Sequence, residues 1–226
     1  MQKPTYLVLR MKILLEKLTL SFVLLTATFV ICLVGLLAVA DLVFEDRNLS
    51  FDEYVFSHIL PFINPTNTRI MEAITFLGSP VFLIPANILL ILFFLLIKKL
   101  PYAALSITVI SLTSTAVLFL LKAVLDRERP LLPVIAAAHG YSFPSGHTFS
   151  SVVFFGMLAY TTYKNVKSNF FKWSIITALI FITGTIGFSR VYLKLHFASD
   201  VIAGLFLGIM WLFLGKWVVF TTAKKL

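Results

Sequence analysis

Residues 189–219, with the sequence SRVYLKLHFASDVIAGLFLGIMWLFLGKWVV, join a short polar segment to a long apolar one. From residue 197 onward the run has only two charged residues, Asp200 and Lys216, in 23 positions. About 20 mostly apolar residues are enough for a helix to cross the hydrocarbon core of a bilayer. The stretch therefore predicts a membrane-spanning helix that begins close to Arg190, His196 and Asp200. Ionisable groups are costly in a membrane chain and usually mark a functional site.

The rest of the chain has the same apolar character. Hydrophobic residues make up 59% of the 226 residues, charged residues make up 13%, and the mean hydropathy is +0.97. A soluble domain carries about 25% charged residues. We therefore predict an all-α, polytopic membrane protein in which residues 1–226 form a single domain. Six spans are expected, at about 18–40, 80–97, 101–121, 147–163, 173–190 and 197–219, with a long loop at 41–79.

The basic residues are unevenly divided between the two sets of helix ends. Twelve lie on the side of both termini and seven on the opposite side. Cytoplasmic segments carry the excess of lysine and arginine, so both termini are predicted to be cytoplasmic. The loop at 41–79 then lies outside, in a bacterium on the periplasmic or extracellular face of the inner (cytoplasmic) membrane. This topology also accounts for the net charge of +9, so no nucleic acid partner is expected, and no oligomeric state is predicted.

Two segments allow alternative interpretations. The run at 18–40 ends in Ala38-Val39-Ala40, which resembles a signal-peptidase site, but its 23 residues exceed the roughly 7–15 of a signal-peptide core. We expect an uncleaved first helix; cleavage would remove one span and leave the sidedness of the others unchanged. The outer loop could form short interfacial helices at 51–56 and around 70–74, above the polar residues of the spans. The alternative is a solvated acidic loop.

Three polar clusters interrupt the apolar chain. They are Lys122-x6-Arg129-Pro130, Pro144-Ser145-Gly146-His147 and Ser189-Arg190-x5-His196-x3-Asp200. The predicted topology places all three on the outer side. A lone basic residue at the end of a span is usually a snorkelling anchor, but three of them converging with two histidines are not well explained in that way.

The histidines and the carboxylate suggest catalysis. On a helix, His196 and Asp200 would share one face, and the carboxylate could fix the ring tautomer and leave the other nitrogen as nucleophile or base. By itself such a pair also fits a buried structural contact. The segment before His147 would begin a helix, whose free N–H groups favour an anion, and Gly146 would allow close approach.

A metal site is the alternative use of His147, His196 and Asp200, since two histidines and a carboxylate can bind a divalent ion. The three cations beside them would repel a metal and instead require an anion. Guanidinium groups match phosphate oxygens in pairs. We therefore predict phosphate chemistry without a metal or other cofactor.

The order and spacing of the clusters resemble the three signature motifs of the type 2 phosphatidic acid phosphatase superfamily. The resemblance implies that His196 attacks phosphorus to form a phosphohistidine, that Asp200 orients it, and that His147 is the general acid and then the base. It also implies that the phosphate is held by Lys122, Arg129, Ser145, Gly146 and Arg190.

The expected function is metal-independent removal of the terminal phosphate from a lipid phosphate or lipid diphosphate that reaches the site from the bilayer. Polyprenyl diphosphate, phosphatidylglycerophosphate, phosphatidic acid and lipid A phosphate are the candidate substrates, with undecaprenyl diphosphate first if the source is bacterial. A lipid phosphotransferase on the same fold is the nearest alternative. A lipid transporter is a further one, although transporter sites usually lie near the membrane midplane.

Overall fold

The computed structural model describes the backbone of residues 3–136 and 139–223, and within that range the side chains of residue 20 and of residues 22–215. The described residues form helices and no strands. The helices are α1 (Lys3–Phe44), α2 (Ser50–Ile59), α3 (Pro65–Phe76), α4 (Pro80–Leu92), α5 (Pro101–Leu125), α6 (Gly146–Asn165), α7 (Asn169–Tyr192) and α8 (Ala198–Ala223). A short 3₁₀ turn, η1 (Leu60–Phe62), follows α2, and a π-helical turn, η2 (Phe93–Ile97), extends α4.

The predicted spans after residue 79 agree closely with the helices, since α4 with η2 covers 80–97 and α7 extends only a few residues beyond 173–190. The helix α1 begins at Lys3, well before the predicted span at 18–40. Five segments of the described chain are long and apolar enough to cross a membrane: Phe22–Phe44, Pro65–Ile97, Pro101–Leu125, Asn169–Tyr192 and Ala198–Gly215. The predicted span at 147–163 corresponds to α6, which is not among these five segments. The six-span arrangement therefore stays a prediction.

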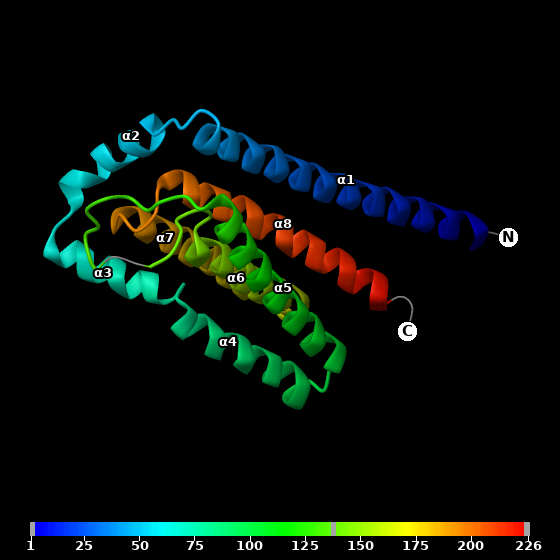
Figure 1. The fold of residues 1–226 in the computed structure, drawn as a ribbon. Coiled ribbons are helices and arrows are strands. Elements are labelled where there is room, and N and C mark those ends of the chain that lie inside the picture. Colours follow the sequence, from blue (N-terminus) through cyan, green and yellow to red (C-terminus); the bar gives the residue numbers. More distant parts are fainter. Residues whose placement is uncertain (1–2, 137–138, 224–226) are drawn as a thin grey trace.

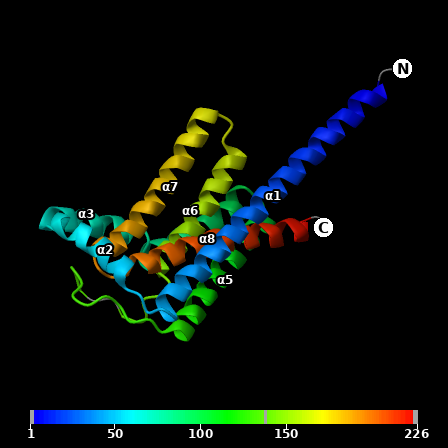
Figure 2. The ribbon, with the colours of Figure 1, turned by 90° about the horizontal axis from the view of Figure 1, so that it is seen from above.

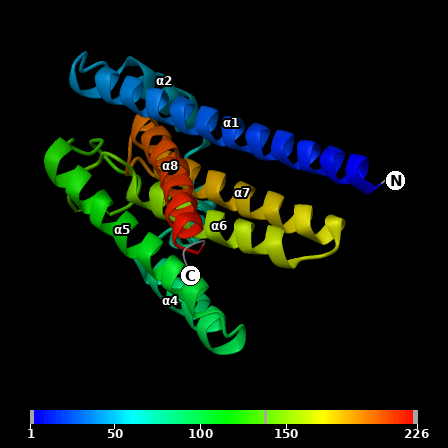
Figure 3. The ribbon, with the colours of Figure 1, turned by 90° about the vertical axis from the view of Figure 1, so that its right-hand side faces the viewer.

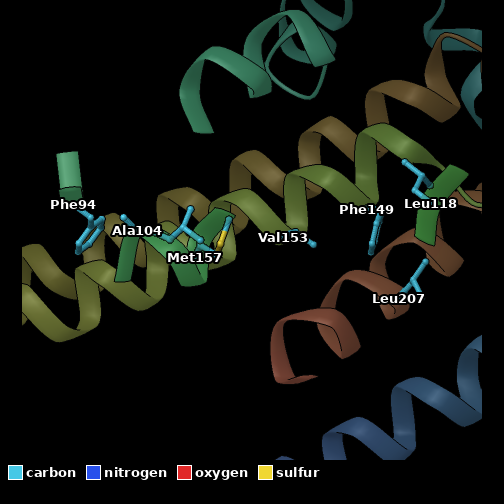
Figure 4. Close-up of a cluster of buried hydrophobic side chains, with 8 residues drawn as sticks. Phe94, Ala104, Leu118, Phe149, Val153, Met157 and Leu207 are labelled. Carbon is cyan, nitrogen blue, oxygen red and sulfur yellow. The ribbon is translucent and has the colours of Figure 1, made fainter. Parts of the chain in front are cut away.

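The position of α6 explains its more polar composition. It packs along much of its length against α7 and α8, and it also contacts α4 and α5 (Figures 1 and 3). Phe149, Val153 and Met157 of α6 lie in one buried cluster with Leu118 of α5 and Leu207 of α8 (Figure 4). A helix enclosed by other helices does not need an apolar surface on every side, so serine and threonine are tolerated there.

Two glycines of α8 allow it to lie directly against α6. A Cβ atom at Gly208 would lie 2.6 Å from the Cβ atom of Val152, and one at Gly204 would lie 2.8 Å from the carbonyl oxygen of Ser145. Small residues that bring helix backbones together are a common device in membrane bundles. In this protein they fix the start of α8 against the start of α6, where two of the three polar clusters lie.

The loop at 41–79 is largely helical. Its helices α2 and α3 cover the end of the bundle at which α5 ends and α8 begins, whereas the start of α1 and the end of α8 lie at the opposite end (Figures 1 and 2). The prediction that this opposite end is cytoplasmic depends on its basic residues, and the structure does not describe the side chains of many of them. Its cytoplasmic position stays a prediction.

Replacing Gly204 with alanine is expected to destabilise the protein by about 1–3 kcal/mol, because the neighbouring atom is a backbone oxygen that has little room to move. The apparent Tm in detergent should fall by several degrees. Gly184→Ala is the matched control, since nothing lies within 4 Å of a Cβ atom there. An equal Tm for the two variants would contradict the close contact between α6 and α8.

Candidate active site

His196 and Asp200 lie together in a buried position. His196 Nδ1 is 3.3 Å from Asp200 Oδ2, and the two residues are 2% and 0% exposed. The expectation that both lie on one helical face is wrong, because α8 begins only at Ala198 and His196 precedes it. The contact arises because Asp200, in the first turn, turns back toward the connection and also accepts the N–H of Phe197 at 2.9 Å. This is the backward hydrogen bond of a capping box.

The contacts of Asp200 determine the orientation of the imidazole ring. The hydroxyl of Ser142, which lies just before the second cluster, donates a hydrogen bond to Asp200 Oδ2. Since a carboxylate only accepts, His196 Nδ1 carries the proton and Nε2 keeps its lone pair. His196 Nε2 lies 3.2 Å from Arg129 Nη1, so the free nitrogen faces a cation that can hold an anion beside it.

The second cluster forms the start of α6, as predicted. Ser145 is fully buried, its N–H donates to the carbonyl oxygen of Asp200 at 3.0 Å, and its hydroxyl accepts from Thr148 at 3.0 Å. A Cβ atom at Gly146 would lie 3.2 Å from Leu118 Cδ2. Glycine therefore keeps this helix start close to α5. His147 is partly exposed and lines a cavity of about 270 Å³ between α4, α5 and α6.

The three predicted cations are held by neutral groups. Lys122 Nζ donates to the carbonyl oxygen of Tyr141 at 2.5 Å. Arg129 donates to the carbonyl oxygens of Gly140 at 2.8 Å and Leu195 at 2.7 Å. Such contacts fix the side chains without neutralising them.

Arg190 is 4% exposed. Its Nη1 donates to the hydroxyl of Thr75 in α3 at 2.9 Å, and its Nε is buried without a hydrogen-bond partner among the described residues. Within the described side chains, none of these three cations has a carboxylate within 4.0 Å. Arg190 is the buried cation of the three, and a buried charge needs a partner. An anion beside it would supply that partner.

Residues 103–224 match the family model of the PAP2 superfamily, and this match covers more than half of the chain. The chain belongs to the PAP2 superfamily. Phosphatidylglycerophosphatase B of Bacillus subtilis (strain 168) is 30% identical over 169 residues, which are 74% of this chain and 82% of that protein. Lipid phosphate phosphatase delta of Arabidopsis thaliana is 32% identical over 91 residues, 38% of this chain and 20% of that protein.

Two solved structures are similar to this chain. The crystal structure of the transmembrane PAP2-type phosphatidylglycerolphosphate phosphatase from Bacillus subtilis has a TM-score of 0.77 and 26% identity, and the match covers 88% of this chain and 97% of that one. The crystal structure of Aquifex aeolicus LpxE has a TM-score of 0.59 and 22% identity, and the match covers 75% of this chain and 96% of that one. At this identity the match shows a similar fold. With its apolar helices, the protein is an integral membrane protein and a PAP2-type lipid phosphatase.

Two charged residues of this PAP2 site were not predicted from the sequence. Arg127 donates to Asp200 Oδ1 at 2.5 Å and to Asp52 Oδ2 at 2.9 Å. Arg127 lies inside the first motif at a position that the motif does not specify, and Asp52 is one of several acidic residues in the outer loop. His58 and His139 lie outside the three motifs; the ring of His58 lies 2.8 Å from the carbonyl oxygen of Tyr54.

Burial lowers the pKa of His196 from its ordinary value of 6.5 to about 4, although the hydrogen bond and charge of Asp200 act in the opposite direction. Between these two pH values the unfolded chain binds more protons at this residue than the folded protein does. Stability is therefore expected to fall as the pH falls from 6.5 toward 4. His196→Gln removes this group, so its apparent Tm should fall less over that window than the Tm of the wild type. An equal fall would contradict the assignment.

Proposed function

We propose that this PAP2 enzyme removes the terminal phosphate of a lipid phosphate or lipid diphosphate through a phosphohistidine on His196. The observation that carries the proposal is a set of three cations that have no carboxylate partner among the described side chains and lie beside a buried histidine whose Nε2 keeps its lone pair. A phosphate group satisfies these cations. It also brings phosphorus to the histidine, and the same cations stabilise the charge of the transition state.

In the first step, His196 Nε2 forms a bond to phosphorus while the bond from phosphorus to the leaving oxygen breaks. His147 gives its proton to that oxygen. The proton stays on Nδ1 throughout, and Asp200 accepts a hydrogen bond from it and stabilises the positive charge that develops on the ring. Lys122, Arg129 and Arg190 hold the phosphate oxygens, with Ser145 and the Gly146 N–H completing the cradle.

In the second step, water attacks the phosphohistidine. His147, now neutral, takes a proton from the water, the bond from phosphorus to Nε2 breaks, and inorganic phosphate leaves. No metal takes part in either step, as the sequence predicts. The contacts of Asp200 support this part of the proposal, because both of its carboxylate oxygens already accept hydrogen bonds from protein groups.

The cavity beside His147 supports a lipid as the carrier of the phosphate. Its walls include Leu83 and Ile84 of α4 and Leu118 and Phe119 of α5, which are suited to an acyl or prenyl chain. In this proposal six spans surround the site and both termini lie in the cytoplasm. A lipid then enters the site sideways from the outer leaflet. The names of the relatives make phosphatidylglycerophosphate the first candidate, with undecaprenyl diphosphate, phosphatidic acid and lipid A phosphate next.

Phosphate release by the purified protein from a panel of these lipids tests the proposal. We expect release without an added acceptor, unchanged activity in a metal chelator, and inhibition by vanadate, which resembles five-coordinate phosphorus. Transfer of phosphate only when an acceptor alcohol is present would instead indicate a phosphotransferase. Loss of activity in the chelator would overturn the metal-free mechanism.

A further inference from the structure

Asp52, in the outer helix α2, is a buried carboxylate that the mechanism above does not use. It is 1% exposed. Its Oδ1 accepts the backbone N–H of Ser199 at 2.9 Å, and its Oδ2 accepts the Ser199 hydroxyl at 2.6 Å and Arg127 Nη2 at 2.9 Å. Ser199 is in the first turn of α8, so the carboxylate meets free N–H groups and the positive end of the helix dipole. This contact attaches α2 to the helix that carries Asp200.

Arg127 joins the two carboxylates. Its Nη1 donates to Asp200 Oδ1 at 2.5 Å while its Nη2 donates to Asp52, and the guanidinium lies 4.1 Å from the centre of the Phe197 ring. Its side chain is 8% exposed. Both of its Nη atoms are already bonded to protein groups. Arg127 therefore differs from Arg129 and Arg190, which have no carboxylate partner among the described side chains, and it is not available to hold a phosphate.

The charges of these residues affect the reaction. The phosphorylated ring of His196 is positive, and a negative Asp200 lowers its energy. Arg127 alone would cancel the charge of Asp200 and leave little net attraction for the ring. Asp52 cancels Arg127 in turn, so the three groups together keep one negative charge next to the histidine.

We propose that Asp52 and Arg127 are positioning residues of the reaction. They fix the start of α8, and Asp52 preserves the effective negative charge of Asp200. This role rests on the proposed phosphohistidine. It also makes the outer helix α2 a functional part of the site, which is complete only when α2 is docked on α8.

The first test is Asp52→Asn, which keeps the shape of the side chain but leaves the charge of Arg127 uncompensated. We expect kcat to fall by about tenfold or more, because the charge of Arg127 lies within several ångströms of the positive ring and repels it. KM should change little, since no phosphate ligand is altered. Glu53→Gln is the matched control, because Glu53 is the neighbouring acidic residue on α2 and is exposed. Wild-type kcat in Asp52→Asn overturns the proposal.

The second test is the double variant Asp52→Asn with Arg127→Gln, which removes both charges and leaves Asp200 negative. We expect its kcat to exceed that of Asp52→Asn by at least about threefold. A kcat equal to or below that of Asp52→Asn overturns the electrostatic role. If Asp52→Asn alone does not fold, the double variant decides by itself: a kcat within about thirtyfold of the wild type supports the proposal and a larger loss overturns it.

His196→Ala, assayed in parallel, separates this inference from the proposed function. If His196→Ala keeps wild-type activity, the phosphohistidine itself is wrong. If His196→Ala is inactive and Asp52→Asn is unaffected, only the role of Asp52 and Arg127 fails.

Discussion

His196→Ala is expected to lower the rate of phosphate release by at least about a thousandfold, since the alanine side chain cannot form the covalent intermediate. The unprotonated Nε2 of His196 lies 3.2 Å from Arg129 Nη1, whereas Nδ1 is held by Asp200. Alanine removes the nucleophile and leaves the cations in place. The lipid phosphate should therefore still bind while turnover stops. The measurement is phosphate release in detergent, together with lipid binding by the inactive variant.

His58→Ala is the control for this experiment. His58 is an exposed histidine on α2, and its ring contacts Ser57 and Tyr54 of the same helix. The control should keep wild-type activity, and only the wild type and the control should incorporate labelled phosphate into the protein. Unchanged phosphate release by His196→Ala would rule out His196 as the nucleophile.

The helices and the residues of the site could be predicted from the sequence because each has a local signal. Apolar runs of about 20 residues identify membrane helices without any knowledge of their partners. The spacing Lys122-x6-Arg129, with Pro144 to His147 and Arg190 to Asp200, is specific enough to name a family. These signals depend on neighbouring residues alone, so they can be recognised without a structure.

The remaining features depend on contacts between distant parts of the chain. The hydrogen bonds of Asp52 to Ser199 join residues that are 147 positions apart, and no local pattern distinguishes Asp52 from the other acidic residues of its loop. The backward contact of Asp200 with His196 also escaped prediction, because the four-residue spacing suggested a shared helical face although His196 precedes the first turn of α8. The enclosed position of α6 determines its composition, and this position is a property of the whole bundle.

Arg190→Gln is expected to lower kcat/KM by about a hundredfold to a thousandfold, the usual effect of removing one preorganised donor for transition-state charge. Arg190 has a second property that makes the experiment decisive. It is 4% exposed, its Nε has no hydrogen-bond partner among the described residues, and no described carboxylate lies within 4.0 Å of it. A buried cation without a partner lowers the stability of the protein that contains it.

The same substitution should therefore raise the apparent Tm, or leave it unchanged, while activity falls. Arg190→Lys keeps the charge but loses the planar pair of donors, so its activity should lie between those of Gln and the wild type. Vanadate inhibition should weaken in the same order. Arg69→Gln is the control, because Arg69 is an exposed arginine on the outer helix α3 and should affect neither quantity. If Arg190→Gln instead loses stability and activity together, Arg190 supports the fold through Thr75, and the phosphate is held by other residues. Opposite changes in stability and activity indicate a cation that is kept for its substrate at a cost to the fold.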